Sequence, residues 1–479
     1  MLDDLVTRVD AAIGNTVERQ ILRHHKRRLE RNGWGAALLG GETLWAEGEP
    51  PPRPGNDVEV LIDGASALPR IVDAIEGARS HVHVAGWFLS LDFALRRDGS
   101  PLQLRELLAE TARRVDTRVL LWAGAPLPLF KPSRATVRNL RDGIERLGVR
   151  CALDDRERPM HCHHEKLVIV DDEVAFVGGI DLTEFTGDRY DSNDHPFRAA
   201  LGWHDAAAEL RGPAVGDVAD HFALRWSEVT EERLATARPE PAGEHAVQIV
   251  QTIPEKIYAA RRRGVFRILE SYVRALRAAE RLIYLESQFL WSPELVAILV
   301  DKLERPPRED FRLVVVLPAD PQHGEEDTRG QLGILADADR GRGRLLACAL
   351  HARDDGRSCP AYVHAKIGIV DDRWLTLGSA NLNDHSLFND TEVNLVTCGG
   401  LARETRERLW AEHLEVSLGE VRGHDPVELV DRRWKPIAHE QLARKKRGDA
   451  LTHRLVHLPH VSRRARGMLG PLQNLVVDG

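Results

Sequence analysis

Features that mark secreted, membrane-spanning and nucleic-acid-coating proteins are scarce in this sequence. Its 479 residues include only five cysteines, and none of them forms a CxxC pair: Cys151, Cys162, Cys348, Cys359 and Cys398. An odd number of scattered cysteines fits a reduced cytosolic protein better than a disulfide framework. No apolar run approaches the ~18 residues that a membrane span requires, and the start of the chain lacks the pattern of a secretory signal. We therefore expect a cytoplasmic protein whose contact with membranes is peripheral.

Positive charge and aromatic residues are also in short supply. The formal net charge is −8, and aromatic residues make up 5% of the chain. Proteins that coat nucleic acids need a basic surface, and those that bind single strands need aromatic platforms for the bases. No nucleic-acid partner is therefore expected. The C-terminal region is locally basic and includes the run Arg444-Lys-Lys-Arg447, which suggests peripheral contact with an anionic membrane surface.

One short pattern occurs twice, two hundred residues apart. Each copy has a His, a Lys two residues later, an Asp after four further residues, and a step of small residues beyond it. The first copy consists of His164, Lys166, Asp171, Gly178 and Gly179, and the second of His364, Lys366, Asp371, Gly378, Ser379 and Asn381. A single copy would be a weak signal, but two copies in the same register are hard to explain by chance.

The pattern of predicted elements repeats as well. Strands are predicted at 58–62, 81–87 and 118–124 and again at 247–250, 282–288 and 311–317, with helices at 65–78, 102–115, 265–279 and 293–302 between them. Such alternation predicts an α/β fold, with two similar α/β/α sandwich halves packed as a pseudo-dimer around one shared active-site cleft. The predicted divisions are a helical lead-in and Pro-rich linker (1–56), a first half (57–238), a second half (244–420) and a basic C-terminal extension (421–479).

The paired His and Lys residues suit chemistry at an anionic phosphorus centre. Residues i and i+2 of a strand share a face, so each His-Lys pair can point into one cleft. A neutral imidazole can attack phosphorus, and the opposite imidazole can donate a proton to the leaving alkoxide. Lys166 and Lys366 would neutralise the phosphate oxygens, so no metal or other cofactor is expected.

Further residues near each copy are expected to support this chemistry. Asp205 and Glu392 follow the two copies and are predicted to orient the imidazoles. Ser379, Asn381 and the backbone around Gly178, Gly179 and Gly378 are predicted to bind phosphate. Asp171 and Asp371 are candidate catalytic residues, although their place at a tight turn favours a structural role at least as strongly. Trp87 and Gln288 occupy matching places in the two halves and are candidates for lining the cleft.

At these residues the chain resembles the phospholipase D superfamily, whose catalytic motif is the duplicated His-x-Lys-x4-Asp. The similarity extends to Trp203-His-Asp, Arg225-Trp226 and Ile283-Tyr-Leu-Glu-Ser-Gln-Phe289 and covers roughly residues 57–420. It implies that His164 forms a phosphohistidine, that His364 is the general acid and base, and that no metal takes part in this step. Gly179 stands where many members of the superfamily have Ser.

The resemblance implies a phospholipase D that hydrolyses glycerophospholipids or transfers their phosphatidyl group, and a monomer is expected. Two alternatives share its chemistry: a phosphatidyltransferase like cardiolipin synthase, and a nuclease, which the acidic charge disfavours. His161-Cys-His-His164 could also be interpreted as a metal cluster, but no matching ligands are evident in the second half. Headgroup preference should depend on loops such as 186–198 and 320–340, which carry no recognisable pattern.

Overall fold

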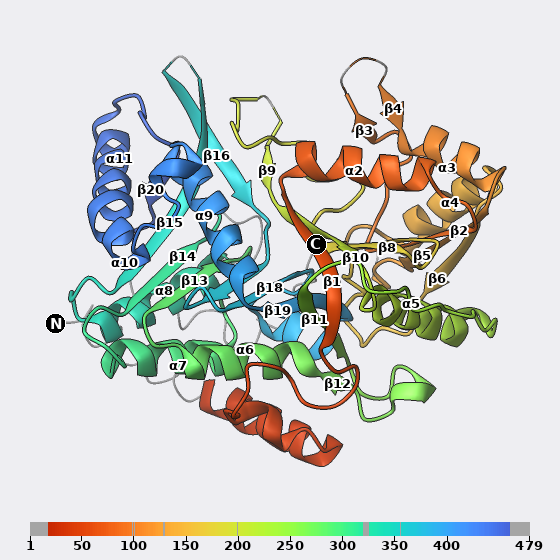
Figure 1. The fold of residues 1–479 in the computed structure, drawn as a ribbon, viewed down its shortest axis with the longest axis horizontal. Helices are drawn as coiled ribbons and strands as arrows, with labels where there is room; N and C mark the ends of the chain where they lie inside the picture. Colours follow the sequence, from red (N-terminus) through yellow and green to blue (C-terminus); the bar gives the residue numbers. More distant parts are fainter. Residues whose placement is uncertain are drawn as a thin grey trace.

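Two α/β units lie side by side in the structure, a computed structural model (Figure 1). The structure describes residues 18–97, 99, 101–127, 130–198, 200–319, 325–354 and 356–459. The first unit contains the first His-Lys pair and the second unit contains the other. The predicted α/β class and its two similar halves are confirmed. No helix in these described ranges is both long and apolar enough to cross a membrane.

Among the described residues of the first half, seven strands form the sheet. Their order is β6 (Arg150–Asp154), β5 (Asp116–Trp122), β2 (His81–Gly86), β7 (Leu167–Val170), β8 (Val174–Gly178), β10 (Ala206–Arg211) and β1 (Arg53–Ile62). Strands β2, β5 and β6 run parallel to one another, and the remaining neighbours are antiparallel. The hairpin β7–β8 at the middle of this sheet follows directly on His164 and Lys166.

The second half repeats this order strand for strand. Its sheet runs β15 (Leu345–Asp354), β14 (Arg312–Val316), β13 (Leu282–Glu286), β17 (Ile367–Val370), β18 (Trp374–Gly378), β19 (Glu392–Cys398) and β11 (His245–Ile253). Strands β1 and β11 pair with each other and join the two sheets. The second motif hairpin, β17–β18, thus occupies the place that β7–β8 has in the first half.

Side chains of each strand in the first half alternate between the two faces of the sheet, and each face packs against different helices. Val119 and Leu121 of β5 pack in a core with helices on one face, whereas Leu120 packs with α5 (Val215–Thr230) on the other face. The helices of the first face are α2 (Gly64–Glu76), α3 (Leu104–Ala112) and α4 (Arg134–Glu145). This period of two is the one expected for a strand buried on both faces.

The second half has the same layers. Its outer helices are α6 (Arg267–Ala278), α7 (Pro293–Glu304) and α8 (Glu325–Asp339), and α9 (Gly400–Leu414) lies on the opposite face of the sheet. Helices α5 and α9 share one continuous core with inward residues of both sheets. Helix α8 corrects the expectation of a loop at 320–340, because most of that segment is helical.

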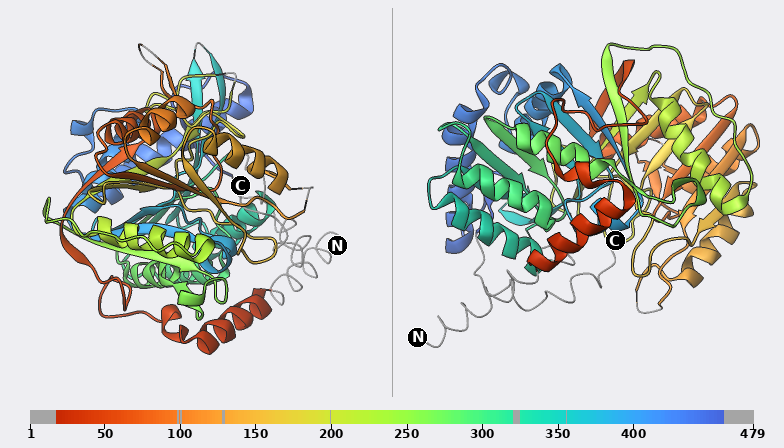
Figure 2. Two further views of the ribbon diagram at one scale, coloured as in Figure 1. Left: turned by 90° about the vertical axis from the view of Figure 1, so that its right-hand side faces the viewer. Right: turned by 90° about the horizontal axis from the view of Figure 1, so that it is seen from below.

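The two ends of the described chain pack against the second half. Residues 18–32 are helical, and His25 stacks on Phe388 and contacts Glu294; Figure 2 shows this segment crossing beneath the molecule. Near the other end, β20 (Leu455–His457) pairs with β15, and α11 (Lys435–Arg447) rests on it. The segment predicted as a C-terminal extension therefore adds a strand to the second sheet. Residues 1–17 and 460–479, within the predicted lead-in and extension, lie outside the described residues.

Candidate active site

Each catalytic candidate precedes the central strand of its own half. His164 and Lys166 come just before β7, and His364 and Lys366 just before β17. All four side chains are buried, with 1–6% of their surface exposed. Lys166 Nζ donates to the carbonyl of His164 at 2.6 Å, and Lys366 makes the same contact with His364. Each ammonium group is thus bound to the backbone of its motif histidine.

The two halves exchange their orienting carboxylates. His164 Nδ1 lies 3.0 Å from Glu392 Oε1, and His364 Nδ1 lies 2.6 Å from Asp205 Oδ2. An ionised carboxylate only accepts hydrogen bonds, so each Nδ1 carries the proton and each Nε2 is left for chemistry. The sequence predicted this role for both carboxylates but did not reveal that each serves the histidine of the other half.

Backbone pairing enforces the exchange. His164 N donates to Thr391 O at 3.0 Å, and His364 N donates to His204 O at 2.8 Å. The second pairing continues as a parallel contact between β16 (Arg357–Val363) and β9 (Trp203–His204). The segment that leads into each motif is therefore bound to the carboxylate-bearing segment of the opposite half. This arrangement brings His164 and His364, which are two hundred positions apart, to one site.

The site around His364 has an excess of positive charge. Burial, Lys366, Lys166 and Arg189, in that order, hold the pKa of His364 well below its usual range, and His164 adds to the effect. Burial also raises the pKa of Asp205 to about 6, against the opposing influence of Lys366. An anion entering between these cations would reverse the shift at His364, because an opposite charge favours the imidazolium. The electrostatics therefore suit an anionic ligand.

Arg189 is a component that the sequence did not point to. Its guanidinium lies 3.6 Å from the centre of the Trp203 ring, and Trp203 packs against His364 at 4.3 Å between ring centres. The Arg189 side chain also donates to the carbonyls of Phe185 and Gly187. Arg189 stands in an irregular loop at no fixed spacing from the motif, so no sequence pattern could have identified it.

Asp181 is a second such component, and comparison of the repeats could have found it. Lys166 Nζ lies 3.4 Å from Asp181 Oδ2. Asp181 occupies the position that Asn381 has in the second copy, where the Asn381 amide lies 3.5 Å from Gln288. Gln288 in turn donates to the hydroxyl of Tyr362 at 2.9 Å. Gln288 therefore contacts Asn381 of the second copy, and its place in the lining of the cleft stays a prediction.

The small residues that follow each motif make contacts within the protein. The backbone N–H groups of Gly179, Gly378 and Ser379 donate to Ala206, Lys366 and Val393, so they are already occupied. The Ser379 hydroxyl donates to Glu392. At Gly178 a side chain would collide with Ala206 and Ala207, and a Cβ on Gly179 would lie 2.2 Å from Asp205 Oδ1. These contacts support the carboxylates and the sheet, and phosphate binding by these residues stays a prediction.

Asp171 and Asp371 lie at the far ends of their strands. Asp171 accepts from the backbone N–H groups of Arg79, Ser80 and His81, and Asp371 accepts from those of Glu280, Arg281 and Leu282. The four residues of β7 or β17 separate each carboxylate from its His-Lys pair, and at about 3.3 Å per residue they span roughly 13 Å. These contacts favour the structural alternative for Asp171 and Asp371.

Other candidate site residues near the first motif contact side chains of the protein itself. Trp87 packs in a small aromatic cluster with Trp122 at 6.1 Å, so it is a packing residue. His163 lies 3.1 Å from Asp154. His161 lies 3.1 Å from His385 and 3.4 Å from Asp390, so the second half does place potential metal ligands beside it, contrary to expectation.

Comparison with known proteins connects both halves to one family. The family model described as "Phospholipase D" matches residues 74–202, and "Cardiolipin synthase, PLD-like domain" matches 272–408. The chain is similar to phospholipase D A of Dictyostelium discoideum, at 26% identity over 76% of this chain and 36% of that protein. It is also similar to phospholipase D alpha 3 of Arabidopsis thaliana, at 24% identity over 72% of this chain and 63% of that protein.

Two bacterial proteins extend the comparison. The major cardiolipin synthase ClsA of Bacillus subtilis is 25% identical over 71% of this chain and 65% of its own length. The crystal structure of a phosphatidylserine synthase from Haemophilus influenzae covers 88% of this chain and 98% of its own, with a TM-score of 0.53 and 14% identity. This structural match establishes a common fold. The chain spans between about a third and two thirds of the length of these three curated relatives.

Proposed function

Because this chain belongs to the phospholipase D superfamily, we propose that it is a phosphodiesterase acting on glycerophospholipids through a phosphohistidine intermediate. The observation that supports this most directly is the crossed pairing of His164 with Glu392 and of His364 with Asp205. Two imidazoles with their Nδ1 atoms tied to carboxylates, next to two lysines, match the needs of a two-step displacement at phosphorus.

In the first step, Nε2 of neutral His164 attacks the phosphorus of the diester. A bond from nitrogen to phosphorus forms, the bond to the departing alkoxide breaks, and His364 donates a proton to that oxygen. Lys166 and Lys366 neutralise the charge that accumulates on the non-bridging oxygens. Glu392 stabilises the positive charge on the His164 ring through its Nδ1 proton.

In the second step, His364 removes a proton from water or from an alcohol. The resulting nucleophile attacks the phosphohistidine, the nitrogen–phosphorus bond breaks, and His164 returns to its neutral state. Water gives phosphatidate, whereas an alcohol gives a new phosphatidyl ester. The substrate phosphate supports the necessary protonation cycle, because its negative charge offsets the cations that lower the pKa of free His364.

A phosphatidyltransferase like cardiolipin synthase is the second candidate. The match of residues 272–408 to a model described by that name, together with the relative from Bacillus subtilis, favours it. It requires the same two steps, with the hydroxyl of a second lipid as the acceptor. In either case we propose a cytoplasmic enzyme that meets the membrane peripherally, with the basic end of α11 at Arg444–Arg447 near anionic headgroups.

The proposal is tested with purified protein and phosphatidylcholine vesicles containing a little ethanol. We expect phosphatidate and phosphatidylethanol, and neither product from His164→Ala or His364→Ala protein. Vesicles of phosphatidylglycerol serve the second candidate, which predicts cardiolipin and free glycerol. Cleavage of DNA without turnover of any lipid would overturn both proposals in favour of a nuclease.

A further inference from the structure

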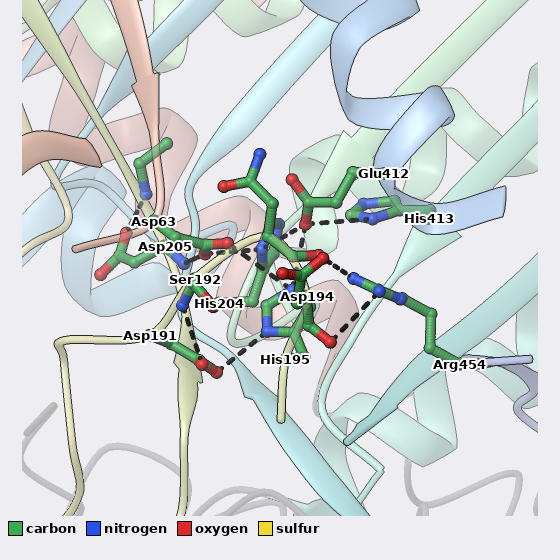
Figure 3. A network of polar contacts seen from close by, with 12 residues as sticks. Asp63, Asp191, Ser192, Asp194, His195, His204, Asp205, Glu412, His413 and Arg454 are labelled. Atoms are coloured by element: carbon green, nitrogen blue, oxygen red, sulfur yellow. Dashed lines mark hydrogen bonds and ion pairs between the residues drawn. The ribbon is translucent and has the colours of Figure 1, made fainter. Parts of the chain in front are cut away.

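A second group of buried histidines and carboxylates lies next to Asp205 (Figure 3). It consists of Asp63 after β1, His195 in the loop that precedes β9, His204 of β9 and Glu412 of α9. The four side chains are at most 9% exposed. They come from four separate segments and from both halves of the chain. The proposed catalytic steps use none of them.

The potential ligand atoms of this group form a closed ring. Asp63 Oδ1 lies 2.9 Å from His204 Nδ1, which lies 3.3 Å from Glu412 Oε1. Glu412 Oε1 lies 3.0 Å from His195 Nε2, which lies 3.6 Å from Asp63 Oδ2. A tetrahedral zinc site with metal–ligand distances of about 2.0–2.1 Å has ligands about 3.3 Å apart. The observed separations cluster around that value.

Carboxylates outside the ring fix the orientation of both imidazoles. His195 Nδ1 lies 2.9 Å from Asp191 Oδ2, and His204 Nε2 lies 2.9 Å from Glu286 Oε2. A metal-binding histidine typically donates its other ring N–H to a carboxylate in this way, which directs the remaining nitrogen at the ion. Both histidines of the ring have this arrangement, and their remaining nitrogens face the same carboxylates.

The ring also contains polar atoms that the protein leaves without hydrogen bonds. Asp63 Oδ2 and Glu412 Oε2 are buried and have no hydrogen-bond partner, although Oδ2 faces His195 Nε2. Within the described ranges, no Lys or Arg forms an ion pair with Asp63, Glu286 or Glu412. The positive groups that face these carboxylates are the imidazoles of His195 and His204, whose pKa values the carboxylates raise, so a metal ion would take over the role of two imidazolium groups. A bound cation would satisfy both the charge and the orphaned oxygens.

We propose that Asp63, His195, His204 and Glu412 bind one divalent transition-metal ion of the zinc class. Two nitrogen and two oxygen ligands, with one atom from each residue within 4.8 Å of the others, suit Zn²⁺ or Co²⁺ and disfavour Mg²⁺ and Ca²⁺, which prefer oxygen ligands in larger number. With four protein ligands and burial on all sides, the site is structural. This inference of an ion does not rest on the proposed phospholipase activity.

The position of the ion would connect it to the active site. Asp63 N donates to Asp205 O at 2.7 Å, and Asp205 N donates to Asp63 Oδ1 at 3.2 Å. His204 accepts the backbone N–H of His364. The ion would therefore fix the two segments that carry the His364–Asp205 pair. Coordination by His195 would also fix the loop around residues 186–198. Its ligands are positioning residues for that pair.

The test begins with the full chain, dialysed against a chelator and then titrated with a metal salt alone. We expect one Zn²⁺ per chain by elemental analysis, a Tm that rises with Zn²⁺ but not with Mg²⁺ or Ca²⁺, and the intense visible absorption of tetrahedral Co²⁺ when Co²⁺ is used. A protein that binds neither Zn²⁺ nor Co²⁺ would overturn the proposal and leave a network of protonated imidazoles. None of these measurements depends on a lipid assay.

Variants locate the ion. His195→Asn and Glu412→Gln should each weaken Zn²⁺ binding by about 100-fold or more, because loss of even an outer partner costs 10–100-fold. The matched control is His221→Asn, which removes a buried imidazole that contacts a buried carboxylate, Glu165, at 2.6 Å but belongs to no ring. Retention of Zn²⁺ by both ligand variants, or its loss from the control alone, would contradict the assignment. If a ligand variant fails to fold, the Co²⁺ spectrum of the unaltered chain still decides the coordination geometry.

Discussion

The two half-sites share one motif but differ in what surrounds their carboxylates. Glu392, which orients His164, also accepts hydrogen bonds from the hydroxyls of Ser379 and Ser386. Asp205, which orients His364, accepts instead from the backbone of Ala206 and lies against Gly179, where there is no side chain. The first pair is therefore fixed by hydroxyl groups, whereas the second is packed against bare backbone.

This difference suggests a division of labour between the histidines. Burial leaves Asp205 with a pKa of about 6, close to the range in which a general acid or base works best. The charge of the His364–Asp205 pair can thus change near neutral pH. The hydroxyls of Ser379 and Ser386 hold the Glu392 carboxylate by hydrogen bonds beside His164, which suits a nucleophile that must carry positive charge after attack. The comparison supports His164 as the nucleophile and His364 as the acid and base.

Replacing each histidine by Ala should have the largest effect and separates the two roles. We expect either variant to lose about 10⁴-fold or more in kcat, as when a nucleophile or its base is removed. With a substrate whose leaving group needs no proton, His364→Ala should still accumulate a phosphoenzyme, whereas His164→Ala should not. Acid-quenched protein labelled from a ³²P-phosphodiester reports the adduct. Labelling of His164→Ala protein would exchange the roles of the two half-sites.

Neutralising the carboxylates should have the next largest effect and should differ between the half-sites. Asp205→Asn and Glu392→Gln should each lower kcat/KM by about 10²–10⁴-fold, because an amide disturbs the tautomer that the imidazole needs. In the unaltered enzyme, kcat/KM should fall as the pH drops below about 6, since Asp205 becomes protonated and neutral there. This acid limb should disappear in Asp205→Asn and persist in Glu392→Gln. A pH–rate profile with the limb retained in both variants would contradict the assignment.

Substitutions of Gly179 and Ser379 test directly how the packing around the two carboxylates differs. Gly179→Ala introduces a Cβ 2.2 Å from Asp205 Oδ1, so we expect a loss of about 1–3 kcal/mol in the free energy of unfolding and about a 100-fold loss in kcat through displacement of Asp205. Ser379→Ala removes one hydrogen bond to Glu392, and its effect on stability should be about 1–2 kcal/mol. Urea denaturation and kcat are measured together. Equal kinetic effects of the two changes would mean that the half-sites do not differ in this respect.

The smallest kinetic effect is expected at the aspartates of the two turns. Asp171→Ala and Asp371→Ala each leave three backbone N–H groups without their carboxylate partner, which should lower the free energy of unfolding by about 1–3 kcal/mol. Because both residues lie far from the site, kcat should change by no more than about twofold at a temperature where the variants are folded. A large drop in kcat with unaltered stability would restore a catalytic role to these residues.

The repeated elements were predictable because their signals are local. Strand periodicity located the central strands of both halves, and repetition of the motif identified the His-Lys pairs without any knowledge of the fold. Helix α8 was missed because Gly330 and Gly333 lower its helix propensity, while the burial of Leu332 and Leu335 in the core stabilises it. Tertiary packing overrides the local preference there.

The composition of the site was less predictable than its centre. Asp205 and Glu392 could be proposed from chemistry, but which histidine each one serves depends on pairing between segments that are distant in sequence. Arg189 and the ring around Asp63 come from irregular loops and separate strands, where no periodicity links the residues. Asp171 and Asp371 belong to the motif as written, yet they bind the backbone of a neighbouring strand. The motif therefore includes residues that stabilise the fold as well as residues proposed for catalysis.

The crossed pairs also constrain how a duplicated gene segment of this kind can evolve. Since each imidazole depends on a carboxylate encoded in the other copy, a harmful substitution in one copy damages both functional units at once. Within one chain, neither copy supplies both a motif histidine and the carboxylate that it contacts. Divergence therefore has to proceed by matched substitutions across the junction, so the two copies are inherited and selected as a single unit.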